Sequence, residues 1–539
     1  MTQTTISQLV IDALRASSIE RLYCIPGVQN DDFFNVLFDA HEITPVVTRH
    51  EQGAAYMALG AAQVTGKPAA FCVVPGPGML NASAALTSGY WAYARVLAVI
   101  GQINTDLMGF GGGALHELRD QTAILSQLTK HTVSLREGQH AAALVQEAVD
   151  ALHGGVPRPV SLEVPANVWS ELADGSIVAP SPSPPAIDPS IIERAAETLD
   201  GAQRPLIVVG SGAYGASEEI IALAEQLQIP VTTRRQGHGV MPTGHPLFVP
   251  LTVGYKLWEH ADVVLGIGSR LEWPMGTWGY DNDLQLITIN IDSDELDRYG
   301  VGAIGIHGDA AEAASALASA CGRAERPELL ADAQRHREWF AEATEHLVPQ
   351  RSYTAAIREA MPDDGVLVED VTQIGFASHL FYDHLAPRTF LTSGAAGTLG
   401  AGTAVAIGAA DATDKPVVGI IGDGGFLFTA TELATAAQYD IPCNILLFNN
   451  NSYGNVKRIQ ALRFGAERTI ASTLQNPDFA KLADAFGVRY WHTDTPEGVT
   501  KALSESIDHQ GPSLVEVSVD PMPNPWPFLR MAPLRSPKT

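Results

Sequence analysis

The chain of 539 residues has few cysteines, few basic residues and no long apolar run. Its four cysteines, Cys24, Cys72, Cys321 and Cys443, are scattered singly, which argues against a zinc cluster or a disulfide framework and indicates reduced thiols. Lys and Arg number 34 against 60 Asp and Glu, and the net charge of −26 argues against nucleic acid or an anionic membrane as a partner. With no apolar run of membrane-spanning length and no signal-peptide pattern at the N-terminus, we expect a cytoplasmic protein.

What the chain does contain is enough apolar sequence for several domains. It is 46% hydrophobic and only 17% charged, which excludes wholesale disorder. Helix-like and strand-like stretches alternate in three blocks, a pattern typical of parallel α/β folds. We predict three doubly wound parallel-sheet domains, at residues 1–175, 188–322 and 350–525. The Pro-rich segment 179–185 is a predicted linker, and 526–539 a loop-like tail.

The most informative motif lies in the third block. Gly422-Asp423-Gly424 closes an apolar run at 417–421, and a second apolar run at 445–448 ends in Asn449-Asn450. Strand, helix and parallel strand together take about 30 residues, so Asp423 and Asn450 should emerge side by side at the carboxyl ends of two neighbouring strands, where open α/β sheets bind ligands. One carboxylate, one amide oxygen and a backbone carbonyl suit Mg²⁺, which takes its remaining ligands from water and phosphates. The glycines and the following helix start suit a diphosphate.

This string resembles the thiamine-diphosphate (ThDP) enzyme family, which includes acetolactate synthases, benzoylformate decarboxylases and pyruvate decarboxylases. The residues that carry the resemblance are Gly422-Asp423-Gly424, Glu432-Leu433, Pro442, Asn449-Asn450 and Tyr453-Gly454. The resemblance implies the cofactors ThDP and Mg²⁺ and a domain order of pyrimidine-binding, central Rossmann-like and diphosphate-binding. It implies a metal held by Asp423, Asn450 and the Ser452 carbonyl, and a diphosphate bound near Gly422, Asp423, Gly424, Gly425, Tyr453 and Gly454.

The resemblance also assigns the activating acid. In ThDP enzymes a glutamate hydrogen-bonds the aminopyrimidine ring of the cofactor, and Glu51 stands in the matching string after the strand-like residues 46–48. The alternative is that Glu51 has no catalytic role and is an acidic residue at a helix N-terminus, which the helix dipole favours. The family implies further contacts with the cofactor. The loop with Pro75 and Gly76 would line the cofactor ring. Leu399 would hold the cofactor in a bent shape beside Gly397, and Thr372 and Gln373 would contact the diphosphate.

His116 is the candidate for proton transfer at the substrate, because a histidine can give or take a proton near neutral pH. Acetolactate synthases carry glutamine there. A surface or capping role is the alternative, since the chain has 16 histidines. Gln29, on a loop that reaches the same pocket in related enzymes, is a second candidate.

A dinucleotide pattern, Gly-x-Gly-x-x-Gly, occupies 210–215 after a strand-like run. We favour a role of this pattern in the fold over a role in binding a ligand, because the next strand carries no ribose-binding acid at its end. In the family this domain binds FAD, ADP or nothing; we expect no FAD, although the pattern permits it.

Four features of acetolactate synthases are absent: Ala166 replaces a lysine, Ile459 a tryptophan, Pro274 an arginine and His116 a glutamine. We therefore predict decarboxylation of a 2-oxo acid, carboligation of the product, or both. The alternatives are an acetolactate-synthase-like carboligase with FAD, a non-catalytic nucleotide-binding scaffold and, on 210–215 alone, an NAD-dependent oxidoreductase. The family also implies a homodimer or homotetramer with active sites between subunits acting on a 2-oxo acid or acyloin, and we expect Trp526 and Phe528 to close the pocket.

Overall fold

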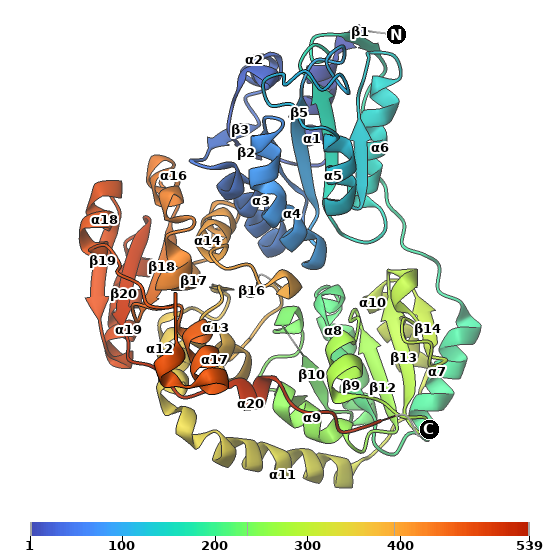
Figure 1. Ribbon diagram of the computed structural model, residues 1–539. Coiled ribbons are helices and arrows are strands. Elements are labelled where there is room, and N and C mark those ends of the chain that lie inside the picture. Colours follow the sequence, from blue (N-terminus) through green and yellow to red (C-terminus); the bar gives the residue numbers. More distant parts are fainter. Residues whose placement is uncertain (1–2, 234, 393, 537–539) are drawn as a thin grey trace.

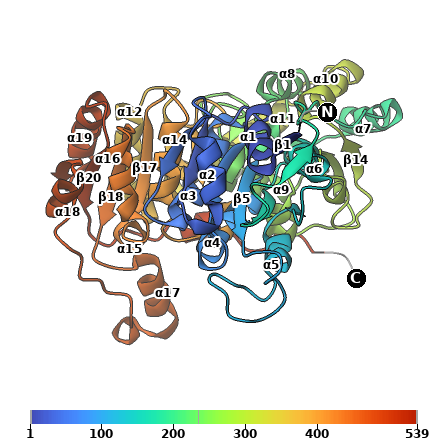
Figure 2. The same cartoon turned by 90° about the horizontal axis from the view of Figure 1, so that it is seen from above.

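The computed structural model describes residues 3–233, 235–392 and 394–536. Its main elements are three six-stranded sheets, each with all its strands parallel and with helices packed against it (Figures 1 and 2). The predicted fold class is therefore confirmed. Within these ranges, no helix has both the length and the apolar character needed to span a bilayer.

The first domain contains a sheet of strand order β3-β2-β4-β5-β7-β6 and a short antiparallel pair, β1 and β8. Its central strands are fully buried apolar runs, as expected of parallel strands covered on both faces. The elements are β1 (Gln3–Thr5), α1 (Ile6–Ala16), β2 (Arg21–Cys24), α2 (Asp31–Leu37), β3 (Thr44–Val47), α3 (Glu51–Thr65), β4 (Ala69–Val73), α4 (Pro77–Trp91), β5 (Val96–Gln102), α5 (Gln121–Leu128), β6 (His131–Ser134), α6 (Ala141–His153), β7 (Val160–Pro165) and β8 (Leu172–Asp174).

The central domain has the strand order β11-β10-β9-β12-β13-β14, in which the third, second and first strands precede the fourth, fifth and sixth. This is the order of dinucleotide-binding folds. The elements are α7 (Pro189–Gly201), β9 (Leu206–Val209), α8 (Ser217–Leu227), β10 (Val231–Thr233), β11 (Phe248–Val249), α9 (Leu251–Trp258), β12 (Val263–Ile267), β13 (Gln285–Asn290), β14 (Ile304–His307) and α10 (Ala310–Ala320). A long helix, α11 (Pro327–Ala343), then bridges to the third domain (Figure 1).

The third domain has the strand order β16-β15-β17-β18-β20-β19. Its strands follow the same sequence of positions as those of the first domain: second, first, third, fourth, sixth and fifth. The elements are α12 (Val348–Ala360), β15 (Val366–Glu369), α13 (Gln373–Phe381), β16 (Phe390–Thr392), α14 (Gly402–Asp411), β17 (Val417–Gly422), α15 (Asp423–Phe426), α16 (Leu433–Gln438), β18 (Cys443–Asn449), α17 (Gly454–Phe464), α18 (Phe479–Phe486), β19 (Arg489–Thr493), α19 (Pro496–Asp508), β20 (Ser513–Ser518) and α20 (Trp526–Leu529).

The first and third domains pack together through α3 and α14. Both helices are rich in alanine and glycine and are almost wholly buried in one hydrophobic cluster shared by the two domains. Gly60 lies on the backbone of Val405 and Ala409, and Gly408 lies on that of Met57, so a side chain at either glycine would clash with the opposite helix. This close approach fixes the two domains relative to each other.

The described part of the tail, which was predicted as a loop, ties the third domain to the central one. Trp526 packs on Phe376 of α13 at a ring distance of 4.7 Å. Phe528 packs on Phe340 of α11 at 6.2 Å. The guanidinium of Arg535 is buried and bonds Asp281 and backbone carbonyls of the central domain. Phe528 therefore contributes to the domain contact.

Candidate active site

The metal-type motif lies at the carboxyl edge of the third sheet. β17 and β18 pair in parallel with Gly422 beside Phe448, so Asp423 and Asn450 follow neighbouring strand ends. The Asp423 carboxylate is 3% exposed and accepts hydrogen bonds from the Ser452 amide (3.1 Å) and the Asn476 side chain (2.8 Å). Burial raises the pKa of this carboxyl, and the hydrogen bonds oppose the rise.

Asp423, Asn450 and Ser452 are thus brought together within one loop cluster. The Ser452 hydroxyl donates to the Asn450 side-chain oxygen at 2.8 Å. The donor set is one carboxylate, one amide oxygen and backbone carbonyls, and this hard, incomplete set fits Mg²⁺ with phosphate ligands. No cluster of three or more His, Cys, Asp or Glu side chains with metal-binding geometry is found in the described part of the chain.

Asn476 is a member of this cluster that sequence reasoning missed. Its side-chain amide donates to Asp423 and also to the side-chain oxygens of Asn449 (3.0 Å) and Asn451 (3.2 Å). It comes from an irregular segment after α17, and no spacing rule marks such a residue.

Glycines allow close packing of the loops at this edge of the sheet. A Cβ at Gly424 would lie 2.7 Å from the Tyr453 ring, and one at Gly454 would lie 2.9 Å from the Asn450 amide. Gly425 would meet Asp370 at 3.1 Å. Asp370 is 2% exposed, and burial raises its pKa to about 6 against hydrogen bonds from backbone amides.

The predicted contacts from the neighbouring loops converge on the same edge. Thr372 caps α13 by accepting from the Gly375 amide, and its methyl lies 3.4 Å from the Cβ position of Gly422. The side-chain oxygen of Gln373 is buried without a hydrogen-bond partner. Gly397 has a left-handed φ of 56° and open space before it, and Leu399 lies 3.3 Å from the Cβ position of Gly425. Gly397 thus leaves the room that a closely approaching ligand needs.

Glu51 begins α3 in the first domain. His50 caps the helix by accepting from the Gln52 amide at 3.1 Å. The Glu51 carboxylate accepts from the side-chain amide of Asn81 on α4 at 3.0 Å, and its side chain is 16% exposed. Asn81 was not singled out from the sequence, because its role arises only when α3 and α4 start side by side. Gly78 lies against Glu51 as well, with 3.6 Å from its Cβ position to Oε1.

The other first-domain candidates form a second group around Gly76. Gly76 has a φ of 61°, and its backbone lies against the carbonyl of His116, so a side chain there would clash. Pro75 lies over Gly101, whose Cβ position is 2.9 Å from the proline ring. The Gln29 amide is 3.4 Å from the Leu115 carbonyl. His116 Nδ1 and Gln29 Oε1 are both buried and form no hydrogen bond within the part of the chain that the structure describes.

The contacts of Glu51, Gly76, His116 and Gln29 all come from the first domain, and those of Asp423 come from the third. These two groups of residues, one in the first domain and one in the third, are called half-sites below.

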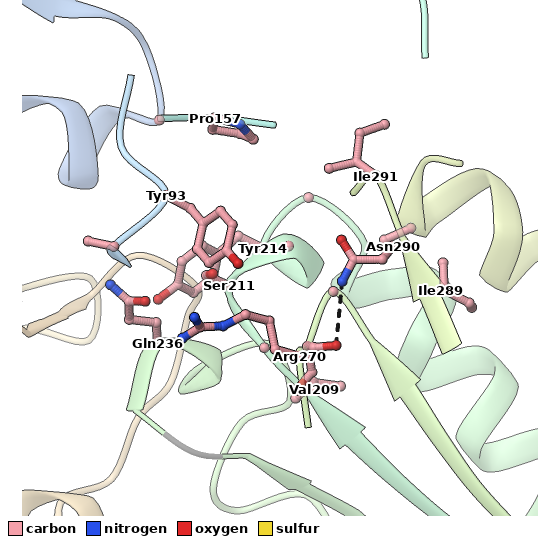
Figure 3. A pocket seen from close by; sticks show the side chains of 18 of the residues that line it. Tyr93, Pro157, Val209, Ser211, Tyr214, Gln236, Arg270, Ile289, Asn290 and Ile291 are labelled. Carbon is pink, nitrogen blue, oxygen red and sulfur yellow. Dashed lines mark hydrogen bonds between the residues drawn. The ribbon is translucent and has the colours of Figure 1, made fainter. Parts of the chain in front are cut away.

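A separate cavity of about 660 Å³ lies at the carboxyl edge of the central sheet (Figure 3). Tyr93 and Pro157 reach it from the first domain, and Arg270 and Asn290 from the central domain, where Asn290 donates to the Ser269 carbonyl at 3.4 Å. Gly210 and Gly212 of the dinucleotide pattern pack against Gly268 and its backbone. This close packing gives the two glycines a role in the fold, and ligand binding by the pattern stays a prediction.

Comparisons with known proteins define the class. Three models of thiamine pyrophosphate enzymes match the chain: the N-terminal TPP binding domain at residues 4–124, the central domain at 192–317 and the C-terminal TPP binding domain at 370–517. The chain belongs to the thiamine pyrophosphate enzyme family.

Among its relatives are a probable 2-ketoarginine decarboxylase of Pseudomonas aeruginosa and a probable acetolactate synthase large subunit of Methanocaldococcus jannaschii. The first is 31% identical over 95% of this chain and 94% of its own length. The second is 30% identical over 96% and 92%. The large subunit of Escherichia coli acetolactate synthase isozyme 1 is 28% identical over 97% and 95%.

Proposed function

We propose that this protein is a ThDP- and Mg²⁺-dependent decarboxylase of a 2-oxo acid, with carboligation as the other fate of the product. The observation that carries the proposal is the pair of half-sites: Glu51 held by Asn81 in one domain, and Asp423 with Asn450 in the other. The alternatives without ThDP were a non-catalytic nucleotide-binding scaffold and an NAD-dependent oxidoreductase. We set them aside, because models of thiamine pyrophosphate enzymes match all three domains.

In the proposed enzyme Asp423, Asn450 and the Ser452 carbonyl would hold Mg²⁺. The glycine-rich start of α15 would admit the diphosphate, since backbone amides and the positive end of a helix favour anions. Leu399 would support the cofactor through its aliphatic side chain. When bound, ThDP supplies the carbon nucleophile that attacks a carbonyl, so the protein's task is to bind, orient and manage protons.

Glu51 would exchange a proton with the pyrimidine ring of the cofactor. Its carboxylate is mostly shielded and is oriented by the Asn81 amide, so it presents its remaining oxygen in a fixed direction. A carboxylate held in this way pays little reorganisation when the proton moves.

His116 would transfer a proton at the substrate. Its backbone carbonyl lies against Gly76, and its Nδ1 is buried and forms no hydrogen bond with other described residues. A histidine can protonate the carbon left after CO₂ departs. We therefore favour release of an aldehyde, and Gln29 would bind the substrate beside it.

Carboligation is the second candidate, and the relatives support both activities. One is named a 2-ketoarginine decarboxylase and others acetolactate synthases. The absence of the synthase residues at Ala166, Pro274, Ile459 and His116 favours decarboxylation. FAD in the central cavity would favour the synthase, and a purified protein with flavin absorbance near 450 nm would move the proposal in that direction.

We further propose a homodimer, or a tetramer built from such dimers. α17 has no buried residue, and its Leu462 and Phe464 are 69% and 56% exposed. The loop leading into α5 carries Phe110 at 80% exposure, and α17 and this loop project from the same side of the molecule (Figure 2). Exposed apolar residues beside two half-sites indicate an interface between copies. A fully active monomer in sedimentation velocity would contradict this, and Leu462→Glu should weaken association.

The four cysteines are buried and unpaired, and on this ground we propose a cytoplasmic location.

The decisive experiment is CO₂ release from a panel of 2-oxo acids with ThDP and Mg²⁺, with analysis of products for aldehyde and acyloin. Glu51→Gln should bind ThDP but lose most turnover, while Glu20→Gln, at an exposed position, should change neither. CO₂ with aldehyde supports the decarboxylase, and CO₂ with acyloin the carboligase. No CO₂ from any acid would refute both.

A further inference from the structure

A buried carboxylate outside the proposed mechanism joins the two half-sites within one chain. Glu432 closes the short turn of residues Ala430–Glu432 between α15 and α16 in the third domain, and it is fully buried. Its Oε1 accepts from the backbone amide of His50 at 3.0 Å and from that of Arg49 at 3.2 Å. Its Oε2 accepts from the Arg49 amide at 3.1 Å. The partners belong to the first domain and directly precede Glu51.

Thr435 and Gly53 both lie in close contact with the Glu432 carboxylate. The Thr435 hydroxyl donates to Oε2 at 2.6 Å. Gly53, in the first turn of α3, lies so close to the carboxylate that any Cβ there would clash with Oε1 and come within 2.8 Å of Cγ. Burial raises the pKa of the Glu432 carboxyl, and the hydrogen bonds from Thr435, Arg49 and His50 oppose the rise.

The need for such a group follows from the start of the helix. The amides of Arg49 and His50 lie before α3, so they have no partner within it. A buried N–H without an acceptor costs about 1–3 kcal/mol. Glu432 supplies the acceptor for both and so fixes the backbone from which the next residue, Glu51, leaves.

We propose that Glu432 is a positioning residue for Glu51: it holds the backbone before α3 from the opposite domain and thereby aims the activating carboxylate. This rests on the proposed function, because it needs Glu51 to be the acid that meets the cofactor. Glu432 follows Asp423 on the same segment, so the segment that carries the metal ligand also sets the place of the acid. The role explains both Glu432 and Gly53, which the proposed chemistry leaves unused.

The test compares three substitutions at Glu432. Glu432→Gln keeps the length and one acceptor oxygen, so it should retain most of kcat, with its NH₂ group facing the Thr435 hydroxyl. Glu432→Asp keeps the charge but withdraws the oxygens from Arg49 and His50. Glu432→Ala removes them, and it should lower kcat by about 100-fold, the scale of a 1 Å misplacement, while ThDP affinity measured by titration changes little. We therefore expect kcat to fall in the order Gln, Asp, Ala.

A second measurement does not depend on activity. Gly53→Ala should lower the melting temperature strongly when Glu432 is present and much less in the Glu432→Ala background, because the clash is then gone. Gly201→Ala, at the end of α7 with open space around it, is the matched control and should act equally in both backgrounds. If Glu432→Ala fails to fold, the comparison of Asp with Gln decides the matter.

A kcat order with Asp above Gln would mean that charge, and not reach, is what Glu432 supplies, and would overturn the proposal. So would equal effects of Gly53→Ala in both backgrounds. An unchanged kcat in Glu51→Gln would instead refute the proposed role of Glu51, whatever Glu432 does, so the two failures are distinguishable.

Discussion

Lowering the pH from 8 to 5 should weaken the contact between the central and third domains, because two histidines are buried there in neutral form. His238 and His384 are each 3% exposed, and their rings stack at 4.1 Å. His238 also meets the His379 ring nitrogen at 3.1 Å, and His379 in turn bonds Glu369 at 3.0 Å. Phe390 closes the cluster from its edge at 4.6 Å from His384.

The sign and size follow from the pKa values. Burial, and after it the neighbouring His379, lowers the pKa of His384 to about 3, and burial with its two histidine neighbours holds the pKa of His238 well below the ordinary value. The unfolded chain takes up protons at these histidines below pH about 6.5 and the folded chain does not. Stability is thus fully present above that pH and is lost as the pH falls. At pH 5 the loss from His384 is about 2 kcal/mol, and His238 adds to it in the same direction.

Other groups titrate in the same range, so the prediction is a difference between variants. Burial raises the pKa of Asp370 to about 6, so protonation of this carboxyl stabilises the folded protein as the pH falls. In the wild type this gain partly offsets the loss of stability caused by the histidines. In His384→Gln the drop in melting temperature between pH 8 and pH 5 should be smaller than in the wild type by about 4–8 °C, taking 2–4 °C per kcal/mol. His260→Gln, at an exposed position, is the control and should follow the wild type.

The measurement is a thermal scan of each variant at five pH values, at constant ionic strength. Parallel pH dependence of wild type and His384→Gln would show that His384 titrates normally in the folded protein, and would refute the argument. A steeper fall in the variant would do the same.

The remaining predictions concern the active site and the tail. Asp423→Ala should weaken Mg²⁺-dependent ThDP binding by more than about 100-fold, since even outer-shell partners of a metal cost 10–100-fold; titration of ThDP at fixed Mg²⁺ checks this, and unchanged affinity would contradict the metal assignment. Asn81→Ala should lower kcat with little change in ThDP affinity, because the Glu51 carboxylate would lose the hydrogen bond that orients it. A change in ThDP affinity alone would argue against an orienting role of Asn81. Gly76→Ala should destabilise the fold by about 1–3 kcal/mol, as expected for a side chain forced into this φ, and denaturant unfolding measures it. Arg535→Ala should lower the melting temperature, because it frees Asp281 and the carbonyls of the central domain.

The main candidate residues could be proposed from the sequence because they stand at or near the ends of apolar runs. Asp423 and Asn450 directly follow β17 and β18, and Glu51 follows β3 after the short segment 48–50, so their chain positions already place them at a carboxyl edge. The same reasoning gave the fold class, since three alternating blocks of strand and helix leave few other architectures.

The supporting residues could not be found in this way. Asn81 meets Glu51 only because two helices start side by side, and Asn476 reaches Asp423 from an irregular segment. The histidine cluster is assembled from two domains, and no local pattern announces such a contact. The tail was predicted as a loop because residues 520–539 hold six prolines, but its position is fixed by distant partners such as those of Arg535.

The shared strand order of the first and third domains explains why one chain carries two different half-sites. The second strand of each sheet leads into the packed helices α3 and α14: this connection holds Glu51 in the first domain and the loop with Gly397 and Leu399 in the third. The third strand of each sheet leads into Gly76 in one domain and Asp423 in the other. Under the proposed function, the equivalent edges would serve proton transfer and ring contacts in the first domain and anion and metal binding in the third. In the proposed enzyme neither edge alone would bind a cofactor with both a ring and a diphosphate, so a complete centre would combine a first and a third domain.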